Sequence, residues 1–288
     1  MNKSVVKRIP YGIADYGRLR RDNGYYVDKT HFIPAVEAAP YYLFLIRPRR
    51  FGKTLWLSVL QHYYDVNFAK QFDEQFGGTY IGENPTPARN SYLVLMFNFA
   101  IVNPDPRYVQ ESFEANGETV VRGFLRRYQQ YFDQQEQQSI LAFPKTEDRL
   151  RELFSLVAYK DLKLYLIIDE YDNFANTILT THGQATYHEL THGAGFFRYF
   201  FNLLKGATSG QMSGLSRLFI TGVSPITMDD VTSGFNIGDN ISLEPHLNEI
   251  MGFTQAEVEQ ILQHYALSLD VDEYRPVLQA WYDAYRFA

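Results

Sequence analysis

Two short segments combine side chains that can do chemistry: a lysine and a hydroxyl in one, and two carboxylates in the other. The first, Arg47-Pro48-Arg49-Arg50-Phe51-Gly52-Lys53-Thr54, follows the apolar run Tyr42–Ile46 and precedes apolar residues at helical spacing. This order of strand, loop and helix is what a phosphate-binding loop requires. N–H groups at the helix start would attract phosphate oxygens. Lys53 would reach the β- and γ-phosphates, and the Thr54 hydroxyl would bind Mg²⁺.

The loop departs from the full motif G-x-x-x-x-G-K-[ST], because Arg47 stands where the motif has its first glycine. Gly52 is retained and lets the backbone approach a phosphate. The three arginines are candidates for phosphate clamps, with a solvated or acid-paired role as the alternative for at least one of them. For the whole segment, the alternative is an ordinary helix start with a solvated lysine. We expect nucleotide contacts from the following residues: Arg47, Arg49, Arg50, Phe51, Gly52, Lys53, Thr54 and Leu55.

In the second segment, a near-continuous apolar run, Leu164–Ile168, ends in the carboxylates Asp169 and Glu170. Such a run is typical of a parallel strand buried on both faces, and ligands bind at the carboxyl ends of such strands. There Asp169 would hold Mg²⁺, and Glu170 would polarise the attacking water as general base. A solvated acidic loop that includes Asp172 is the alternative. Both segments in one chain favour a site for Mg²⁺ and a nucleoside triphosphate such as ATP.

A third apolar run, Arg217–Thr221, ends in Gly222-Val223-Ser224-Pro225. A polar residue at the end of a strand beside the loop can monitor the γ-phosphate. We nominate Thr221 as this sensor, which would act in catalysis with Glu170 and Lys53, and Ser224 as the second choice. A turn that merely ends the strand is the alternative.

The composition fits a globular enzyme, with 288 residues that are 45% hydrophobic and 16% aromatic. The net charge of −6 gives no overall basic field. Nucleic acid is therefore a possible partner that the net charge does not support. The sequence has no cysteine, which excludes disulfides and thiolate metal sites and fits a reducing cytoplasm. No apolar run approaches the roughly 20 residues of a membrane span. We expect a soluble cytoplasmic protein, and the sequence carries no signal for its oligomeric state.

Strands alternating with helices predict an α/β fold, a three-layer sandwich around a parallel sheet. A glutamate directly after the aspartate suits the nucleotide-hydrolase class with strand order 5-1-4-3-2. We expect one domain over residues 1–250, and the start of a helical lid or linker over residues 251–288. The other expected elements are a helix ending at Ala38, a strand at Leu93–Phe99, one polar helical region at Glu111–Gln138, helices at Leu150–Tyr159 and Phe196–Lys205, a fifth strand at Ile241–Leu243, and a helix after Thr254.

One further motif, His188-Glu189-Leu190-Thr191-His192, matches the helical zinc-protease signature H-E-x-x-H. Its context disagrees with that function. Arg198 stands at the third-ligand position of the longer signature, and two glycines interrupt the helix after the second histidine. We favour a polar loop before the helix that begins at Phe196.

Five motifs in this order resemble those of the bacterial AAA-ATPase-like family, in which an arginine in place of the first glycine is typical. The resemblance covers nearly the whole chain. It implies a P-loop ATPase in which Lys53 and Thr54 bind phosphate and Mg²⁺, and Asp169 and Glu170 form the acidic pair. The motifs are Pro10–Ile13, Tyr26–Thr30, Arg47–Thr54, Ile168–Asp172 and Thr221–Pro225.

Members of this family usually continue past a Trp-Tyr-x-Gly-Tyr-Arg-Phe segment into a nuclease-like domain of the PD-(D/E)XK type. Here that segment is Trp281–Phe287, with Ala284 at the glycine position. The resemblance implies that the chain is a fragment, and that hydrolysis of ATP drives a conformational change in the attached or partner domain. The alternatives are a non-hydrolysing nucleotide switch and a DNA-processing or defence module.

Overall fold

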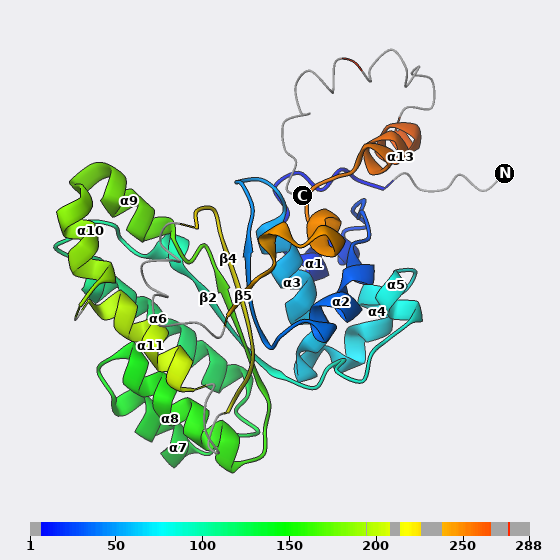
Figure 1. The fold of residues 1–288 in the computed structure, drawn as a ribbon. Coiled ribbons are helices and arrows are strands. Elements are labelled where there is room, and N and C mark those ends of the chain that lie inside the picture. Colours follow the sequence, from blue (N-terminus) through cyan, green and yellow to red (C-terminus); the bar gives the residue numbers. More distant parts are fainter. Residues whose placement is uncertain (1–6, 194, 208–213, 226–237, 266–275, 277–288) are drawn as a thin grey trace.

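A five-stranded, wholly parallel sheet forms the centre of the molecule (Figure 1). The computed structural model describes residues 7–193, 195–207, 214–225, 238–265 and 276. The strand order is β2-β3-β4-β1-β5, which is the expected order 5-1-4-3-2 read from the opposite edge. The α/β fold class is therefore confirmed. The strands are β1 Tyr42–Ile46, β2 Leu93–Asn98, β3 Leu164–Asp169, β4 Leu215–Gly222 and β5 Asp239–Asn240.

Helices cover both faces of the sheet, so the molecule has three layers. Figure 1 shows α1 to α5 on one side and α6 to α11 on the other. The first group is α1 Tyr16–Arg21, α2 Ile33–Ala38, α3 Lys53–Tyr64, α4 Phe72–Phe76 and α5 Tyr80–Glu83. The second is α6 Val109–Arg127, α7 Gln134–Ala142, α8 Thr146–Tyr159, α9 Asn173–His182, α10 Gln184–Thr191 and α11 Phe196–Gly206. Short 3₁₀ helices lie at Thr30–Phe32, Val66–Gln71, Phe99–Ile101, Ile241–Leu243 and Pro245–Ile250, and α13 spans Gln255–Tyr265.

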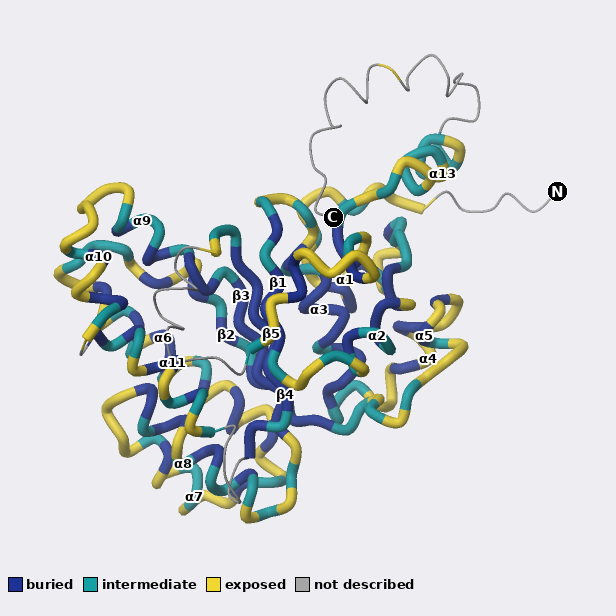
Figure 2. The backbone as a smooth tube through the Cα atoms, in the orientation of Figure 1, coloured by how far each residue is buried: buried dark blue, intermediate teal, exposed yellow. Residues whose placement is uncertain are grey.

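The surroundings of β3 explain why its residues Leu164–Ile168 are apolar without interruption. Leu164, Leu166 and Ile168 pack into the core on the α6 to α11 side, whereas Tyr165 and Ile167 pack into the core on the α1 to α5 side. Successive side chains of a strand point to opposite faces, so a strand covered on both faces is apolar at every position. Figure 2 shows the buried backbone concentrated in the sheet between the two helical layers.

The sheet order brings the ends of three strands together. Strand β4 lies between β1 and β3, with Ile46 opposite Gly222 on one side and Ile168 opposite Ile220 on the other. Because the strands are parallel, their carboxyl ends meet at one edge of the sheet. The loop after β1 and the residues that end β3 and β4 are therefore neighbours, as the expected strand order requires.

The polar region expected as one helical stretch at Glu111–Gln138 is two helices, α6 and α7. Asp133 begins α7 with a capping box, in which its carboxylate accepts from the N–H of Glu136 and its own N–H donates to the Glu136 carboxylate. Before that, Tyr128 follows α6 and its hydroxyl accepts a 2.8 Å hydrogen bond from the N–H of Val94 on β2. The chain leaves α6 there, and Tyr128 covers part of the sheet edge.

The fifth strand expected at Ile241–Leu243 is wrong by position, because β5 consists of Asp239 and Asn240. Residues Ile241–Leu243 form a 3₁₀ helix instead, and the Asn240 side chain caps it by accepting from the N–H of Ser242 at 3.1 Å. A side chain that bonds its own backbone two residues ahead favours a turn over a strand.

The helix expected after Thr254 is α13. A capping box starts it, because Thr254 Oγ1 accepts from the N–H of Glu257 and the Glu257 carboxylate accepts from the N–H of Thr254. The domain boundary expected at residue 250 stays a prediction. The Trp281–Phe287 segment lies outside the described residues. Among the helices of the described residues, none combines the length and apolar character needed to cross a membrane.

Candidate nucleotide site

The segment between β1 and α3 has the backbone of a phosphate-binding loop. Gly52 caps the N-terminus of α3 with φ +87°, a left-handed conformation that glycine adopts without strain. Arg50, two residues earlier, also has a positive φ of +69°. The turn places the amino end of a 12-residue helix at the carboxyl edge of the sheet. The first N–H groups of a helix have no partners within the helix, so this end suits a phosphate.

Lys53 is the first residue of α3, and its side chain folds back over the loop. The side chain is 5% exposed, and Nζ donates to the carbonyl oxygens of Arg47 and Pro48, each at 3.0 Å. Burial lowers the pKa of Lys53, while the negative charges of Glu170 and Asp169 act in the opposite direction. The ammonium is therefore a buried cation between the loop and the carboxylates.

Asp169 joins two of the other expected site residues. Its Oδ2 accepts a 2.7 Å hydrogen bond from the Thr54 hydroxyl, and its Oδ1 accepts a 2.6 Å hydrogen bond from the Thr221 hydroxyl. Asp169 and Thr221 are both fully buried. These three side chains come from the start of α3 and the ends of β3 and β4, and the sheet order together with the turn at Gly52 brings them close.

The same three residues supply oxygen atoms of the kind that Mg²⁺ prefers. Within the part of the chain that the structure describes, no cluster of three or more His, Cys, Asp or Glu side chains could hold a metal on its own. Mg²⁺ commonly uses one or two carboxylates and completes its shell with phosphate oxygens and water. The Thr54 hydroxyl and the Asp169 carboxylate match that donor set.

Glu170 follows Asp169 with φ +54°, which is uncommon for a residue with a side chain. Its Oε2 accepts a 3.0 Å hydrogen bond from the Asn173 amide at the start of α9. Glu170 and Arg49 both line a pocket of about 180 Å³ at this edge of the sheet. The structure therefore places the expected base and one loop arginine in the lining of the same cavity, with Asn173 holding the carboxylate.

The guanidinium of Arg47 takes a position that differs from the phosphate clamp expected for it. Arg47 is fully buried and donates to the carbonyl oxygen of Ser242 at 2.6 Å and to that of Ile46 at 3.0 Å. Its own N–H donates to the carbonyl oxygen of Gly222. A buried guanidinium needs such acceptors. Arg47 thus fixes the segment after β5 to the end of β1, which corrects the expectation for its side chain.

The other loop residues divide between surface and packing positions. Arg49 and Arg50 are exposed. The carbonyl oxygen of Phe51 accepts from the N–H of Gly252, so the loop contacts the chain that leads into α13. Leu55 is partly buried against the core on the α1 to α5 side. Of the three arginines, Arg49 is the one that shares a pocket with Glu170.

Asp172 is a residue whose role the sequence did not reveal. It is 1% exposed, and its carboxylate accepts from the N–H groups of Val223 and Ser224 and from the Asn176 amide. Burial raises its pKa in spite of these hydrogen bonds. The signal was its place two residues after the acidic pair. Asp172 ties the chain after β3 to the chain after β4.

The second sensor candidate, Ser224, lies in that tied segment. Its backbone N–H donates to Asp172 at 2.6 Å, and its carbonyl oxygen accepts from the Tyr171 hydroxyl at 2.7 Å. Gly222 lies directly before this segment, and a Cβ there would come within 2.2 Å of the Tyr171 ring. The ends of β3 and β4 therefore pack as one closely fitted unit beside the loop.

The H-E-x-x-H motif lies away from these residues, on α10. The polar loop expected before Phe196 is shorter than predicted, because the motif is helical through Thr191 and leaves the helix only at His192. The rings of His188 and His192 are stacked with centroids 4.2 Å apart. His192 Nδ1 lies 2.8 Å from the Thr191 hydroxyl, and His188 Nε2 lies 3.3 Å from the Gln184 amide. Glu189 is exposed.

Comparisons with known proteins agree with this geometry. The sequence profile of a family described as "AAA-ATPase_like: Predicted AAA-ATPase" matches residues 10–232. A curated relative from Azotobacter chroococcum mcd 1, described as "Uncharacterized protein in vnfD 5'region", is 26% identical over 287 residues. The match covers 98% of this chain and 49% of the relative, so the chain spans about half the length of that protein. No solved structure gives a significant match. Because the family profile covers more than half of the sequence, the chain belongs to the AAA-ATPase-like family.

Proposed function

We propose that this chain binds Mg·ATP over the loop at residues 47–54 and hydrolyses it. The observation that carries the proposal is the cluster of Thr54, Asp169 and Thr221 next to the buried ammonium of Lys53. This cluster unites a cation for phosphate oxygens, a hydroxyl and a carboxylate for Mg²⁺, and a second hydroxyl that fixes the carboxylate. An ordinary helix start requires none of these contacts.

Lys53 supplies the phosphate-binding cation in this proposal. Phosphate oxygens would replace the carbonyl oxygens of Arg47 and Pro48 as acceptors for its Nζ. A phosphate carries more negative charge than a carbonyl group, so the exchange gives stronger hydrogen bonds. Mg²⁺ would bind the Thr54 hydroxyl and Asp169, and would neutralise charge on the β- and γ-phosphates.

Glu170 is the proposed general base for the attacking water. Its carboxylate lies at the carboxyl end of β3, one residue beyond Asp169, and Asn173 fixes it in place. Arg49 faces the same pocket, where it would stabilise charge on the transferring phosphoryl group. Thr221 would respond to the nucleotide through Asp169, because its hydroxyl already bonds that carboxylate.

The nucleotide state would pass to the rest of the protein through the joined ends of β3 and β4. Asp172 and Tyr171 hold Val223 and Ser224, so a shift at Asp169 or Thr221 would move this segment. The relative is about twice as long as this chain. We propose that the region beyond the matched half, expected to be nuclease-like, receives the conformational change.

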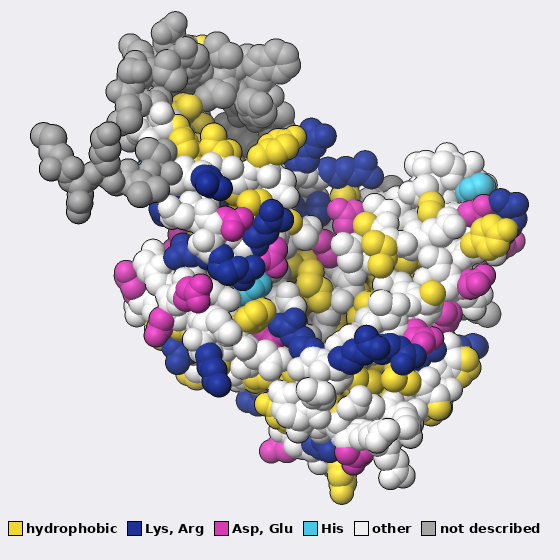
Figure 3. All heavy atoms as spheres, turned by 180° about the vertical axis from the view of Figure 1, so that it is seen from behind, with side chains coloured by type: hydrophobic (Ala, Val, Ile, Leu, Met, Phe, Trp, Pro, Cys, Tyr) yellow, Lys and Arg dark blue, Asp and Glu magenta, His cyan; other side chains and the backbone are white. Residues whose placement is uncertain are grey.

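A role in DNA processing would rest on that further region. On the face that Figure 3 shows, Lys and Arg side chains form small groups interspersed with Asp and Glu side chains. Such a surface differs from the continuous basic stripe typical of nucleic-acid-binding proteins. Salt-sensitive binding of DNA by this chain would favour the DNA-processing alternative.

The test of hydrolysis is the substitution Glu170→Gln. Removing the base should lower the rate of phosphate release by about 10²- to 10⁴-fold, because proton transfer by a positioned side chain contributes that much. Affinity for ATP should change little, since Glu170 is not among the residues proposed to hold phosphate. Phosphate release and ATP binding would be measured in the same samples.

Glu189→Gln is the matched control, because Glu189 is exposed on α10 and is the base that a zinc protease would need. Turnover should be the same as in the unmodified chain. Full turnover in Glu170→Gln would contradict the assignment of the base. Tight ATP binding by the unmodified chain without any phosphate release would favour the non-hydrolysing switch.

A further inference from the structure

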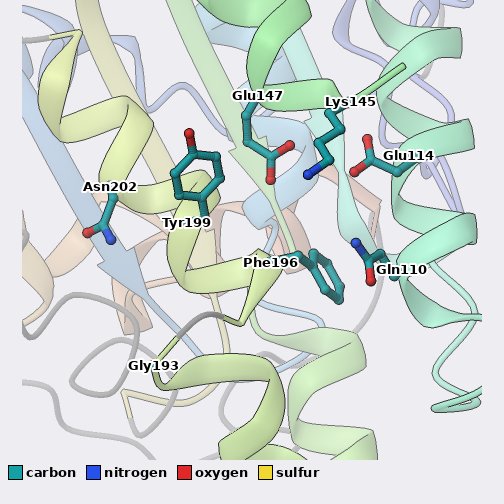
Figure 4. Close-up of a pocket in the computed structure, with 8 residues that line it drawn as sticks. All are labelled: Gln110, Glu114, Lys145, Glu147, Gly193, Phe196, Tyr199 and Asn202. Atoms are coloured by element: carbon teal, nitrogen blue, oxygen red, sulfur yellow. The ribbon is translucent and has the colours of Figure 1, made fainter. Parts of the chain in front are cut away.

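A second cavity lies in the helical layer formed by α6 to α11, away from the phosphate-binding loop. Its volume is about 280 Å³, and it lies between α6, α8 and α11 (Figure 4). None of its residues belongs to the candidate nucleotide site. The lining residues are Gln110, Glu114, Lys145, Glu147, Gly193, Phe196, Tyr199 and Asn202.

Glu147 is the unusual residue of this cavity. It is 1% exposed, and in the described part of the chain its Oε2 has no hydrogen-bond partner. Figure 4 shows its carboxylate directed into the space between Tyr199 and Lys145. Burial raises the pKa of Glu147 and the nearby charge of Glu114 adds to that rise, whereas a hydrogen bond from its own backbone and the charge of Lys145 act in the opposite direction. A buried carboxylate oxygen without a hydrogen-bond partner destabilises a fold.

The walls of the cavity are fixed by hydrogen bonds and close packing. The Glu114 carboxylate accepts from both the N–H and the hydroxyl of Thr146, each at 2.6 Å, at the first turn of α8. Gly117 on α6 packs so closely on α8 that a Cβ there would lie 2.0 Å from Thr146 Oγ1. The Tyr199 hydroxyl accepts from Arg151 at 3.1 Å. The cavity is therefore preformed rather than a gap between loosely packed helices.

The charges that line the cavity select the kind of ligand. Two carboxylates, Glu114 and Glu147, face one exposed amine, that of Lys145, so the lining is net negative and disfavours anions. Among the described residues, no group of three or more His, Cys, Asp or Glu side chains forms a metal site at this cavity. Phe196 and Tyr199 add aromatic surface, and aromatic faces attract cations.

We propose that this cavity binds a small organic cation, whose ammonium or guanidinium group donates hydrogen bonds to the Glu147 carboxylate. The carbon chain of the ligand packs against Phe196 and Tyr199, and the amides of Gln110 and Asn202 serve as further polar contacts. The volume lies just below the range that holds drug-sized molecules, so the ligand is compact, such as a diamine or a guanidino-alkylamine. This site is independent of nucleotide binding.

The test is calorimetric titration of the whole chain with agmatine and with putrescine at fixed ionic strength. Saturable one-to-one binding of at least one of the two is expected. Glu147→Gln keeps the shape of the side chain but removes its charge, and should weaken binding at least about tenfold, because hydrogen bonds to ionised groups are the strong ones. Glu111→Gln changes an exposed carboxylate on α6 outside the cavity, and should leave the affinity unchanged.

Tetramethylammonium distinguishes the carboxylate from the aromatic rings as the source of affinity. It carries positive charge but no N–H donor, so it should bind at least about tenfold more weakly than the better of the two amines. No saturable binding of either amine would overturn the proposal. Equal affinity of Glu147→Gln and the unmodified chain would also overturn it.

The ligand-free stability of Glu147→Gln provides a second readout and shows that the variant folds. The pKa of Glu147 is raised in the folded chain, so folding becomes less favourable as pH rises from the unfolded pKa through the folded pKa. Glutamine does not titrate. Groups that face Glu147, which are Glu114 on α6 and Lys145 and Asp148 beside it, are the same in both proteins. Stability of the variant relative to the unmodified chain should therefore increase as the pH rises from the unfolded pKa of Glu147 through its raised folded pKa. A difference independent of pH would contradict a buried carboxylate with one unpartnered oxygen.

Discussion

Asp169 accepts one hydroxyl hydrogen bond on each of its two oxygen atoms, from Thr54 and from Thr221. Hydrogen bonds to a charged group contribute roughly 1.5–3 kcal/mol each. The two hydroxyls therefore determine the orientation of a fully buried carboxylate. The expected role of Thr221 as a sensor of the γ-phosphate stays a prediction. The geometry adds that any such signal would pass through Asp169.

Gly222 tests at the residue scale whether the close fit between the ends of β3 and β4 matters. In Gly222→Ala, the new methyl group would meet the Tyr171 ring at 2.2 Å and Asp172 Oδ1 at 2.7 Å. Overpacking of a tight core costs about 1–3 kcal/mol of unfolding free energy, occasionally more. Urea unfolding should show that loss, and the Tyr171 to Ser224 contact should be disturbed.

The control is Gly123→Ala on α6, where a Cβ would have no neighbour within 4 Å. That substitution should stabilise the chain by about 0.5–1 kcal/mol, because alanine is the better helix residue. Equal effects of the two substitutions would mean that the packing around Tyr171 is loose. The joined ends of β3 and β4 could then not transmit the nucleotide state.

At the scale of elements, the sequence predicted the elements whose pattern of apolar residues follows directly from which faces are buried. Leu164–Ile168 is apolar throughout because helices cover both of its faces. An apolar run of this short length is typical of a buried strand rather than of a helix. The loop and α3 followed from Gly52, Lys53 and Thr54. The order of strands was inferred from Glu170, which directly follows Asp169 as in one class of nucleotide hydrolases. It was not inferred from any pairing signal between the strands.

The features that the sequence did not predict, both elements and residue roles, depend on single side-chain contacts. Whether Ile241–Leu243 is a strand or a turn depends on which group the Asn240 side chain bonds. Whether Arg47 binds phosphate or protein depends on the carbonyl oxygen of Ser242, which lies 195 positions away in the sequence. The role of Asp172 likewise requires knowledge of where β4 ends, because it bonds Val223 and Ser224. Periodicity and local motifs contain no information of this kind.

The position of α13 can be tested through one ion pair. Lys29 Nζ lies 2.6 Å from Glu257 Oε1, and both side chains are largely buried, at 9% and 18% exposure. Lys29→Met should leave the Glu257 carboxylate without its cation, and should lower the free energy of local opening of α13 by about 1–3 kcal/mol. Hydrogen exchange of the amides in Gln255–Tyr265 would measure this change.

Arg18→Met is the comparison for that substitution, because the pair of Arg18 and Asp22 is exposed at 65% and 46%. It should change stability by less than about 1 kcal/mol, as is usual for a surface pair. Unchanged exchange of α13 in Lys29→Met would show that other contacts, such as that between Gly252 and Phe51, hold the helix.

At the scale of the whole molecule, two separate regions have different proposed ligands. The nucleotide site lies at the carboxyl edge of the strands, where β1, β3 and β4 end. The cation cavity lies among α6, α8 and α11. The segment that leads into α13 contacts the phosphate-binding loop at Phe51, where the N–H of Gly252 donates to the Phe51 carbonyl oxygen.

The most direct test of the nucleotide site is calorimetric titration of the whole chain with Mg·ATP, on the unmodified protein, Lys53→Ala and Lys70→Ala. Lys70 is an exposed lysine outside the loop and controls for loss of charge alone. The unmodified chain and Lys70→Ala should bind one ATP with the same affinity. Lys53→Ala should bind at least about tenfold more weakly, because it loses charge-assisted hydrogen bonds to phosphate. Equal affinity in all three proteins, or no binding by the unmodified chain, would contradict the site at residues 47–54.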